Sequence, residues 1–369
     1  MTKHPTRNKI LAVSFAAVAL AVACDDGSTT GSPDEPFAAL VVTTDFQSGA
    51  YSTISLPDLA PTPNVQVIHD DASCRFDPIT GLPFIVARLG ADAVDVVDPE
   101  AGWQVMKEYS VEAGSNAQDI AVVSEERAYV ARFAKPDLLI VHPTTGAEIG
   151  HVDLSAYADA DGLPEAAWLY PVDGEVFVLL QRLDKLAPTD YSSVLVLDGA
   201  EGTVKDDVRL AATNPTGKLR YSEAVGRLII IETGVFGALD GGIEYLNPED
   251  HALSGLVITE EELGGDVADA AIVSETKGYA VIVVFDGGKA STHVVVFDPS
   301  RGKKLKDLLV SDEWAYPAVE LTPDGTELWV ADRTGDAPGI RIFSTADDVE
   351  LTKKPIDVGL PPSMICFVE

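Results

Sequence analysis

The stretch RAYVARFAKPDLLIVHPTTG, residues 127–146, sets the pattern for most of the chain. Two short runs within it, residues 128–133 and 138–141, are apolar and rich in β-branched or aromatic residues, which favours strands. The tripeptide KPD at 135–137 interrupts pairing and turns the chain. The closing letters HPTTG suit a second turn, because proline fixes φ and glycine tolerates positive φ. The stretch therefore predicts a β-hairpin followed by a turn.

The same hairpin recurs along the chain in varied lettering. Its first strand is centred near Val41, Val86, Val130, Val178, Ile230, Ala280 and Val330, with spacings of 45, 44, 48, 52, 50 and 50 residues. Its second strand recurs as VDVVDP (94–99), LLIVHP (138–143), SVLVLDG (193–199), GIEYLNP (242–248), VVVFDP (294–299) and IRIFST (340–345). Repeats of about 40–50 residues that contain only short strands are typical of propeller blades. We therefore predict an all-β fold, a seven-bladed β-propeller with four-stranded blades.

Each hairpin is expected between an inner and an outer strand. Inner strands are expected near Cys74, Ile120, Trp168, Tyr221, Ala270, Val319 and Ile365. The first hairpin has no inner strand before it, and the inner strand at 363–368 has no hairpin after it. These two leftovers fit one shared blade, so the C-terminal strand is expected to close the ring in the first blade. Six or eight blades are the alternatives, if the first blade is weak or two blades merge.

The first 23 residues have the features of a targeting segment. Three basic residues are followed by the apolar run 10–21, which is too short to span a membrane as a helix. The letters AVAC at 21–24 resemble a bacterial lipobox, in which Cys24 is lipidated and becomes the first residue of the mature chain. Ala21 stands where such motifs usually have Leu, and cleavage by the ordinary signal peptidase near Ala23 is the alternative.

These features divide the chain into three parts. We predict a lipoprotein signal peptide at 1–23, a flexible acidic tether at 24–36 and the β-propeller at 37–369. The polar tether, with the letters DDGSTTGSPDEP after Cys24, cannot bury enough apolar surface to fold. The protein is therefore expected to be exported and anchored by lipid to a bacterial membrane, on the periplasmic side or at the cell surface.

The charge of the chain excludes several classes of partner. Without the three basic residues of the signal peptide, 23 Lys and Arg stand against 59 Asp and Glu, a net charge of −36. This sign excludes nucleic acid, whose phosphates require basic residues. It also opposes flat binding to anionic lipid, so the lipid anchor is the one membrane contact that we expect. A solvated, self-repelling surface of this kind favours a monomer.

The stretch PAVELTPDGTELWVAD, residues 317–332, resembles the YVTN and lactonase-like propeller repeats. The four-letter signature stands as YVAR (129–132), IVAR (85–88) and WVAD (329–332). The resemblance implies a seven-bladed ring, often secreted, with ligands or partners on the face that carries the loops into the inner strands. It does not fix the function, because relatives include lactone hydrolases, surface-layer proteins and proteins without known activity.

Four arginines stand where the first strand of a hairpin ends: Arg88, Arg132, Arg182 and Arg333. In a propeller these ends rise to the same face as the loops that hold Asp71, Asp119 and Glu165. One explanation is salt bridging between blades. The other is an anion-binding mouth, because arginine binds carboxylates and phosphates with two hydrogen bonds. The loop aromatics Trp314 and Tyr316 either cap blades or belong to a sugar or peptide site.

The sequence carries no complete catalytic or cofactor motif. The five histidines of the mature chain lie in different repeats without paired spacing, and no nucleophile elbow, Walker loop or dinucleotide fingerprint occurs. The letters DADG at 159–162 resemble part of a calcium loop, but Tyr157 stands where an oxygen ligand belongs. A solvated acidic loop explains the same letters. We therefore expect no cofactor, with calcium or another divalent metal as the alternative.

Two cysteines remain besides Cys24, and both fall in inner strands of neighbouring blades. Cys74 lies two residues before Phe76, whereas Cys366 lies one residue before Phe367. Because side chains alternate along a strand, this offset places the two sulfurs on opposite faces of adjacent blades. If those faces look at each other, a disulfide forms when the Cα atoms lie within about 7 Å. Two buried thiols are the alternative.

Two functions fit these features. The first is a non-enzymatic, lipid-anchored propeller that binds a protein, peptide or sugar through its loops, as the missing catalytic motif indicates. The second is a lactonase-like hydrolase with a metal at the channel mouth, held by Asp71, Asp119 and Glu165. The second function requires these three carboxylates to converge.

Overall fold

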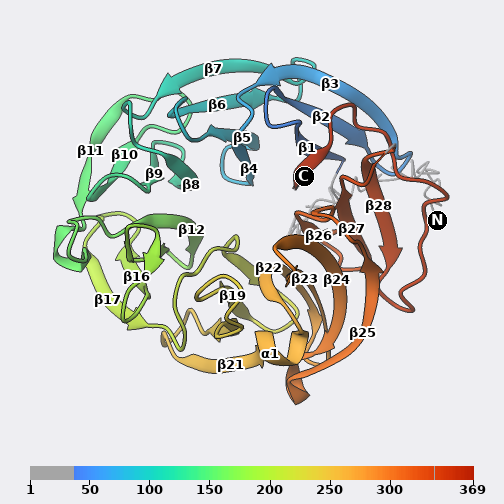
Figure 1. Ribbon diagram of the computed structural model, residues 1–369. Helices are drawn as coiled ribbons and strands as arrows, with labels where there is room; N and C mark the ends of the chain where they lie inside the picture. Colours follow the sequence, from blue (N-terminus) through green and yellow to red (C-terminus); the bar gives the residue numbers. More distant parts are fainter. Residues whose placement is uncertain (1–36, 336) are drawn as a thin grey trace, which may run out of the picture. The chain divides into compact units, whose positions relative to one another are not determined.

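The structure is a computed structural model that describes residues 37–335 and 337–369. These residues form a ring of seven antiparallel β-sheets, the blades, around a central axis (Figure 1). The prediction of a seven-bladed β-propeller is confirmed. The predicted signal peptide, Cys24 and the tether lie outside the described residues. In the described part of the chain, no helix has the length and apolar character needed to cross a membrane.

The blades are numbered along the chain, and their strands are given from the inner to the outer edge. Blade 1 contains β29 (Pro362–Val368), β1 (Ala38–Thr44), β2 (Gly49–Ser55) and β3 (Ala60–Ile68); blade 2 contains β4 (Ala72–Asp77), β5 (Leu82–Ala87), β6 (Ala93–Asp98) and β7 (Gln104–Ser110); blade 3 contains β8 (Ala117–Ser124), β9 (Arg127–Arg132), β10 (Asp137–Val141) and β11 (Glu148–Asp153). Blade 4 contains β12 (Ala166–Val172), β13 (Glu175–Leu180), β16 (Ser193–Asp198) and β17 (Val204–Arg209); blade 5 contains β18 (Arg220–Ser222), β19 (Arg227–Glu232), β20 (Gly242–Leu246) and β21 (Leu253–Thr259). Blade 6 contains β22 (Asp266–Ser274), β23 (Lys277–Asp286), β24 (Lys289–Asp298) and β25 (Lys303–Val310); blade 7 contains β26 (Val319–Leu321), β27 (Glu327–Asp332) and β28 (Gly339–Ser344).

A few short elements interrupt this pattern. A two-stranded hairpin, β14 (Leu183–Asp184) and β15 (Ala187–Pro188), extends from blade 4. The α-helix α1 (Glu260–Leu263) and two 3₁₀ turns, Ser155–Tyr157 and Pro299–Arg301, lie in connections.

The ring closes where the sequence predicts. The C-terminal strand β29 pairs antiparallel with β1, with Ile365 opposite Val41. Blade 1 therefore combines the first and last strands of the propeller. The seven inner strands fall at the predicted positions, from β4 around Cys74 to β29 around Ile365.

Blade 7 departs from the predicted four strands. Its sheet has three regular strands, and the following segment joins β28 only through isolated bridges at Glu350 and Ile356. The segment between these bridges reads LTKKP and ends on Pro355. Because proline has no N–H to donate and lysines favour solvent, a continuous ladder does not form there. The fourth position of this blade is therefore taken by an irregular segment, 350–356, that joins β28 at both of its ends.

Apolar side chains fill the spaces between neighbouring blades. Between blades 3 and 4, for example, the fully buried Tyr129 packs among leucines and valines from both sheets. Between blades 7 and 1, the rings of Trp329 and Phe367 meet edge to face, with centroids 5.1 Å apart. Because each blade packs only on its two neighbours, a chain of this length needs no single central core.

The two faces of the ring differ in their connections. One face carries the loops that lead from each outer strand to the next inner strand, together with the turns that follow the second strand of each blade. We call it the loop face. The described chain begins at Phe37 on the opposite face, because β1 runs from there to Thr44 at the loop face.

A disulfide fastens the closure of the ring. The structure joins Cys74 of β4 to Cys366 of β29, with the two Cα atoms 6.3 Å apart. The face of blade 1 that carries Cys366 therefore packs against the face of blade 2 that carries Cys74, as the disulfide requires. The bond ties β29, the inner strand of blade 1, to β4, the inner strand of blade 2.

Candidate functional site

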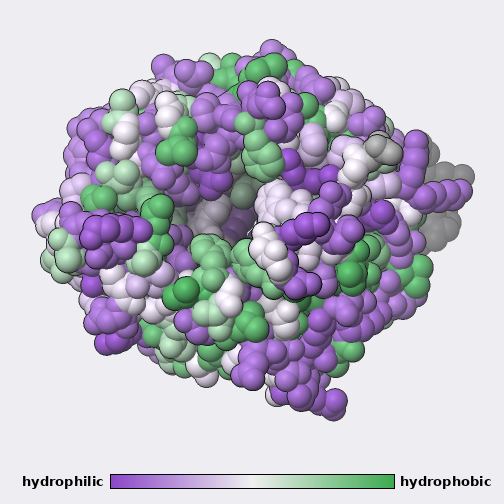
Figure 2. Space-filling model, in the orientation of Figure 1, coloured by the Kyte–Doolittle hydropathy of each residue, from purple (hydrophilic) through white to green (hydrophobic). Residues whose placement is uncertain are grey.

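Exposed apolar side chains gather on the loop face. Of the 17 exposed large apolar residues in 37–335 and 337–369, nine lie in its loops or adjoining strand ends: Phe46, Leu89, Leu186, Val235, Phe236, Leu239, Phe285, Val310 and Trp314. Three lie on the opposite face, four in outer strands, and Leu351 lies in the irregular outer segment of blade 7. In a view down the axis of the ring, apolar patches lie beside a central hollow (Figure 2). Exposed aromatic side chains are enriched where proteins bind partners.

Two exposed aromatic rings of this face lie against an arginine. The guanidinium carbon of Arg333 is 4.6 Å from the ring centroid of Phe46 and 5.5 Å from that of Trp314. Its Nη1 donates to the carbonyls of Pro361 and Pro362 at 3.1 Å, and its Nη2 donates to the carbonyl of Thr44 at 2.9 Å. Burial lowers the pKa of Arg333. Arg333 therefore supports the two rings from within the protein.

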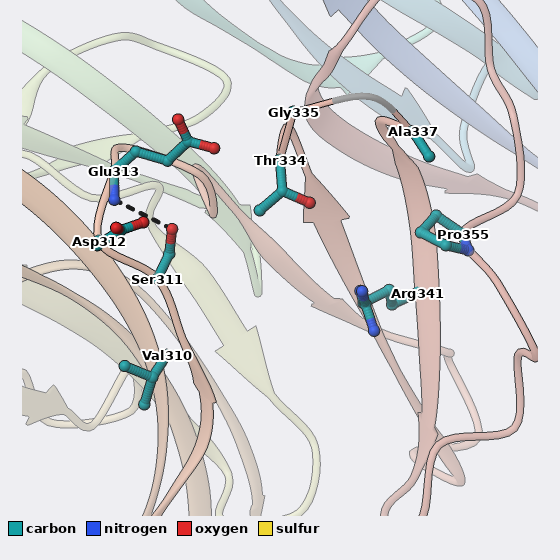
Figure 3. A pocket seen from close by; sticks show the side chains of 9 residues that line it. All are labelled: Val310, Ser311, Asp312, Glu313, Thr334, Gly335, Ala337, Arg341 and Pro355. Atoms are coloured by element: carbon teal, nitrogen blue, oxygen red, sulfur yellow. Dashed lines mark hydrogen bonds between the residues drawn. The ribbon is translucent and has the colours of Figure 1, made fainter.

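A cleft of about 710 Å³ opens beside this cluster, between blades 6 and 7 (Figure 3). It is lined by Val310, Ser311, Asp312, Glu313, Thr334, Gly335, Ala337, Arg341 and Pro355. The segment 310–313 forms one wall, and Arg341 with Pro355 lies across from it (Figure 3). Trp314 directly follows the first wall and Arg333 directly precedes Thr334, so cleft and aromatic cluster form one continuous area.

The charges of the cleft are unbalanced. Nε of Arg341 donates to Oδ2 of Asp332 at 2.6 Å, and its Nη1 donates to both oxygens of Glu350 at 3.0 and 3.1 Å. Its positive charge is therefore neutralised by its own blade. Within residues 37–335 and 337–369, neither Asp312 nor Glu313 forms an ion pair. The wall beside Trp314 is consequently negative.

Tyr316 takes no part in this exposed area. It is buried, and the backbone N–H groups of Ala315 and Tyr316 donate to Oγ1 of Thr292 at 2.9 and 2.6 Å. Burial raises the pKa of its hydroxyl. Of the two loop aromatics that the sequence singles out, Trp314 is exposed and Tyr316 packs between blades 6 and 7.

The other three predicted arginines also contact protein groups. Arg88 donates through Nε and Nη2 to Oδ1 of Asp71 at 2.8 and 2.5 Å. Arg132 is almost fully buried and donates to Glu112 at 2.8 Å and to Asp137. Salt bridging thus describes both residues, and the anion-binding mouth stays a prediction.

Arg182 is held differently from these ion-paired arginines. It donates to the carbonyl of Tyr157 and stacks on Tyr191, with its guanidinium carbon 4.0 Å from the ring centroid. Oε2 of the neighbouring Glu165 accepts the N–H of Leu183 at 3.0 Å, and burial raises the pKa of Glu165 to about 7. This part of the loop face is therefore a packed corner of blade 4.

The three carboxylates named for a metal site do not converge. In the part of the chain that the structure describes, no group of three or more His, Cys, Asp or Glu side chains has a metal-binding arrangement. Asp71 pairs with Arg88, Asp119 pairs with Arg75 in the centre of the ring, and Glu165 binds a backbone amide. The prediction that these three residues form the metal site of a hydrolase is therefore wrong.

The acidic turn at 159–162 resembles a calcium loop in sequence only. Oδ1 of Asp159 accepts the N–H of Asp161 at 3.1 Å, and Oδ1 of Asp161 accepts the N–H of Leu163 at 2.9 Å. The carboxylates thus bind the amides of their own turn, as aspartates commonly do in loops. Asp161 is exposed, whereas Oδ2 of Asp159 is buried without a hydrogen-bond partner among the described residues.

Sequence reasoning missed a polar network at the centre of the ring. Arg75 of blade 2 binds Asp119 of blade 3, and Oδ2 of Asp119 accepts the N–H of Leu169 in blade 4. Arg220 of blade 5 repeats this arrangement with Asp269 of blade 6 and the N–H of Val319 in blade 7. Charged letters inside otherwise apolar inner strands were the available signal for this network.

A pair of carboxylic groups is buried beneath the loop 233–241, which carries three of the exposed apolar residues. Glu232 accepts the N–H of Ala212, and Oε2 of Glu244 accepts the N–H of Ala211 at 3.0 Å. Both glutamates are almost fully buried. Burial, and then the charge of Glu244, raises the pKa of Glu232 to about 9.

Comparisons with known proteins give the fold and no family. Neither a family model nor a curated protein sequence matches the chain. Among solved structures, the proposed 6-phosphogluconolactonase of Bacteroides fragilis is 13% identical, with a TM-score of 0.63 over 92% of this chain and 99% of that chain. A protein of unknown function from Desulfotomaculum acetoxidans is 10% identical, with a TM-score of 0.56 over 90% and 99% of the two chains. Dihydro-heme d1 dehydrogenase NirN is 15% identical, with a TM-score of 0.53 over 92% and 76%. The likeness shows the fold.

Proposed function

We propose that this protein is an exported, lipid-anchored β-propeller that binds a partner protein through its loop face and catalyses no reaction. The supporting observation is the gathering of nine exposed apolar side chains on that face of an otherwise highly charged protein. Four of the nine are aromatic, namely Phe46, Phe236, Phe285 and Trp314. Such residues anchor most of the binding energy at protein interfaces.

The direction of the first strand is compatible with this role. The strand β1 starts at Ala38, directly after Phe37, on the face opposite to the loop face. A chain that leads from a lipid on Cys24 would therefore join the ring at the face opposite to the loop face, and its residues 24–36 could span at most about 45 Å. In that arrangement the anchor does not compete with the partner for the loop face.

The proposed relation to the YVTN and lactonase-like repeats rests on the stretch 317–332. That stretch forms β26, the following turn and β27 of blade 7. Lactone hydrolysis is the competing function, because one structural neighbour carries the name of a lactonase. Asp71, Asp119 and Glu165 bind separate partners, so they do not supply the metal site on which that function depended.

Photo-crosslinking in the cells that produce the protein tests the proposal. We place benzoylphenylalanine at position 314 or 236 of the full chain, and at position 106 of the outer strand β7 as the matched exposed control. We expect one discrete protein adduct that is shared by positions 314 and 236 and absent from position 106. Equal adducts at all three positions, or none at the loop face, would contradict the proposal. Turnover of a lactone panel by the purified protein would favour the hydrolase.

A further inference from the structure

One cation at the centre of the ring has weaker contacts than its neighbours. Lys218 lies two residues before β18 of blade 5, and its side chain is only 12% exposed. Its Nζ lies 3.7 Å from Oε2 of Glu320 in blade 7 and 3.9 Å from Sγ of Cys366 in blade 1. Blade 6 separates blade 5 from blades 7 and 1, so residues of these three blades meet only where the inner strands surround the central hollow (Figures 1 and 2). The ammonium therefore lies in the central channel.

The neighbouring arginines of the channel, Arg75 and Arg220, both form paired hydrogen bonds with carboxylates. Nε and Nη2 of Arg75 donate to the two oxygens of Asp119 at 3.0 and 2.5 Å. Arg220 donates to both oxygens of Asp269 and to both oxygens of Glu320, the latter at 3.3 Å. Paired donors of this kind bind a carboxylate well.

The acceptors near Lys218 are already used. The oxygens of Asp119 also accept the N–H groups of Ile120 and Leu169, at 2.9 and 3.0 Å. The oxygens of Asp269 also accept the N–H groups of Ala270 and Val319, both at 3.0 Å. Glu320 is therefore the remaining carboxylate, and Lys218 shares it with Arg220.

This leaves the ammonium short of hydrogen bonds. An ammonium has three N–H donors, and a cation taken out of water needs partners for them. Among the described residues, none offers Nζ of Lys218 an oxygen or nitrogen acceptor within 3.5 Å. Burial lowers the pKa of Lys218, and the charge of Glu320 only partly opposes this shift.

We propose that the central channel binds a small oxyanion, such as a carboxylate, with the ammonium of Lys218 as its principal ligand. An oxyanion brings full negative charge and several acceptor lone pairs, which are the partners that Lys218 lacks. Aromatic rings lie near the same centre: Arg75 stacks on Tyr170 at 5.7 Å, and Tyr170 stacks on Tyr221 with ring centroids 6.3 Å apart. The site is independent of the loop-face cleft, whose unpaired wall is negative.

Titration of the full-length protein in detergent tests this site. Sodium acetate and sodium sulfate are the probes, at constant pH and with sodium chloride keeping the ionic strength fixed. The variant is Lys218→Met, and the matched control is Lys303→Met, whose exposed ammonium pairs with Glu262 on the outside of blade 6. We expect saturable binding to the wild type and to Lys303→Met, and at least tenfold weaker binding to Lys218→Met. Saturation by acetate alone identifies a carboxylate site, and saturation by both probes identifies a general oxyanion site.

A second measurement needs no variant. After reductive ¹³C-methylation of the lysines, the resonance of Lys218 should move on addition of acetate in proportion to the occupied fraction, while that of Lys303 stays in place. Lys218→Gln keeps a polar side chain and identifies the resonance if Lys218→Met does not fold. Binding that is unchanged by Lys218→Met, or a Lys218 resonance that does not respond to either anion, would overturn the proposal. In that case water alone completes the hydrogen bonds of the ammonium.

Discussion

The buried carboxyl of Glu232 should make the stability of the propeller depend on pH. Its pKa is raised from 4.5 to about 9, first by burial and then by the charge of Glu244. The folded protein therefore keeps a proton that the unfolded chain releases above pH 4.5. Stability from this group is fully present below that pH and is lost as the pH rises towards 9. Each pH unit in this window costs about 1.4 kcal/mol, so raising the pH from 5 to 8 removes about 4 kcal/mol.

The variant Glu232→Gln tests this reasoning. Glutamine resembles the protonated acid, keeps an oxygen for the N–H of Ala212, and places an amide where Oε1 of Glu232 has no partner. We expect the variant to gain stability over the wild type by about 1.4 kcal/mol per pH unit between pH 5 and pH 8. Denaturant unfolding at unit steps of pH measures this difference directly.

Subtracting the stability of the wild type from that of Glu232→Gln cancels the contribution of every other titrating group. The pKa values of Glu165 and Glu260 are also raised to about 7, but both groups are present in both proteins. Glu261→Gln, at an exposed position of α1, is the matched control and should differ from the wild type by a constant amount. A gain for Glu232→Gln that is the same at every pH, or that grows towards acid, would refute the buried proton.

Three further outcomes are expected. If Cys24 carries the lipid, Cys24→Ser should move the protein from the detergent phase to the aqueous phase, since each buried methylene adds about 0.8 kcal/mol; wild-type protein in the aqueous phase would contradict the anchor. Thiol titration of the denatured, unreduced protein should find neither Cys74 nor Cys366 free, and Cys366→Ser should lower the free energy of unfolding by roughly 2–5 kcal/mol. Two titratable thiols besides Cys24 would exclude the disulfide. The double variant Phe46→Ser and Trp314→Ser should abolish adducts from position 236, because it removes two aromatic anchors, while its melting temperature stays close to that of the wild type; undiminished adducts would place the partner elsewhere.

The sequence predicts the blades well because the residues that mark a buried strand lie within that strand. A buried strand such as β9 needs apolar residues along its own length, and short apolar runs at regular spacing show this without any knowledge of contacts. The fourth strand of blade 7 is irregular because Lys353, Lys354 and Pro355 oppose a continuous ladder, and two isolated bridges join the segment to β28. A repeat period of about 50 residues gives the number of blades, but it does not show whether the fourth strand of each blade is regular.

The site was predicted less well, since its properties depend on contacts between distant residues. Trp314 and Tyr316 share a loop and a chemical type, yet one is exposed and the other is buried against blade 7. Arg132 ends its strand as predicted, but its partner Glu112 lies 20 residues earlier in a loop whose path the sequence does not reveal. Lys218 reaches residues that lie 102 and 148 positions further along the chain, and no local pattern indicates such a contact.

The contacts at the centre explain how a strongly acidic ring presents a defined loop face. Arg75 joins blades 2, 3 and 4, Arg220 joins blades 5, 6 and 7, and the disulfide joins blade 1 to blade 2. Arg75 positions Asp119 to bind the N–H of Leu169, and Arg220 positions Asp269 to bind the N–H of Val319. These ion pairs therefore fix the inner strands of neighbouring blades relative to one another. A face held in this way needs little further ordering when a partner binds, which lowers the entropic cost of association. The same network consumes the acceptors around Lys218, so the rigidity of the ring and the unsatisfied ammonium in its channel have one origin.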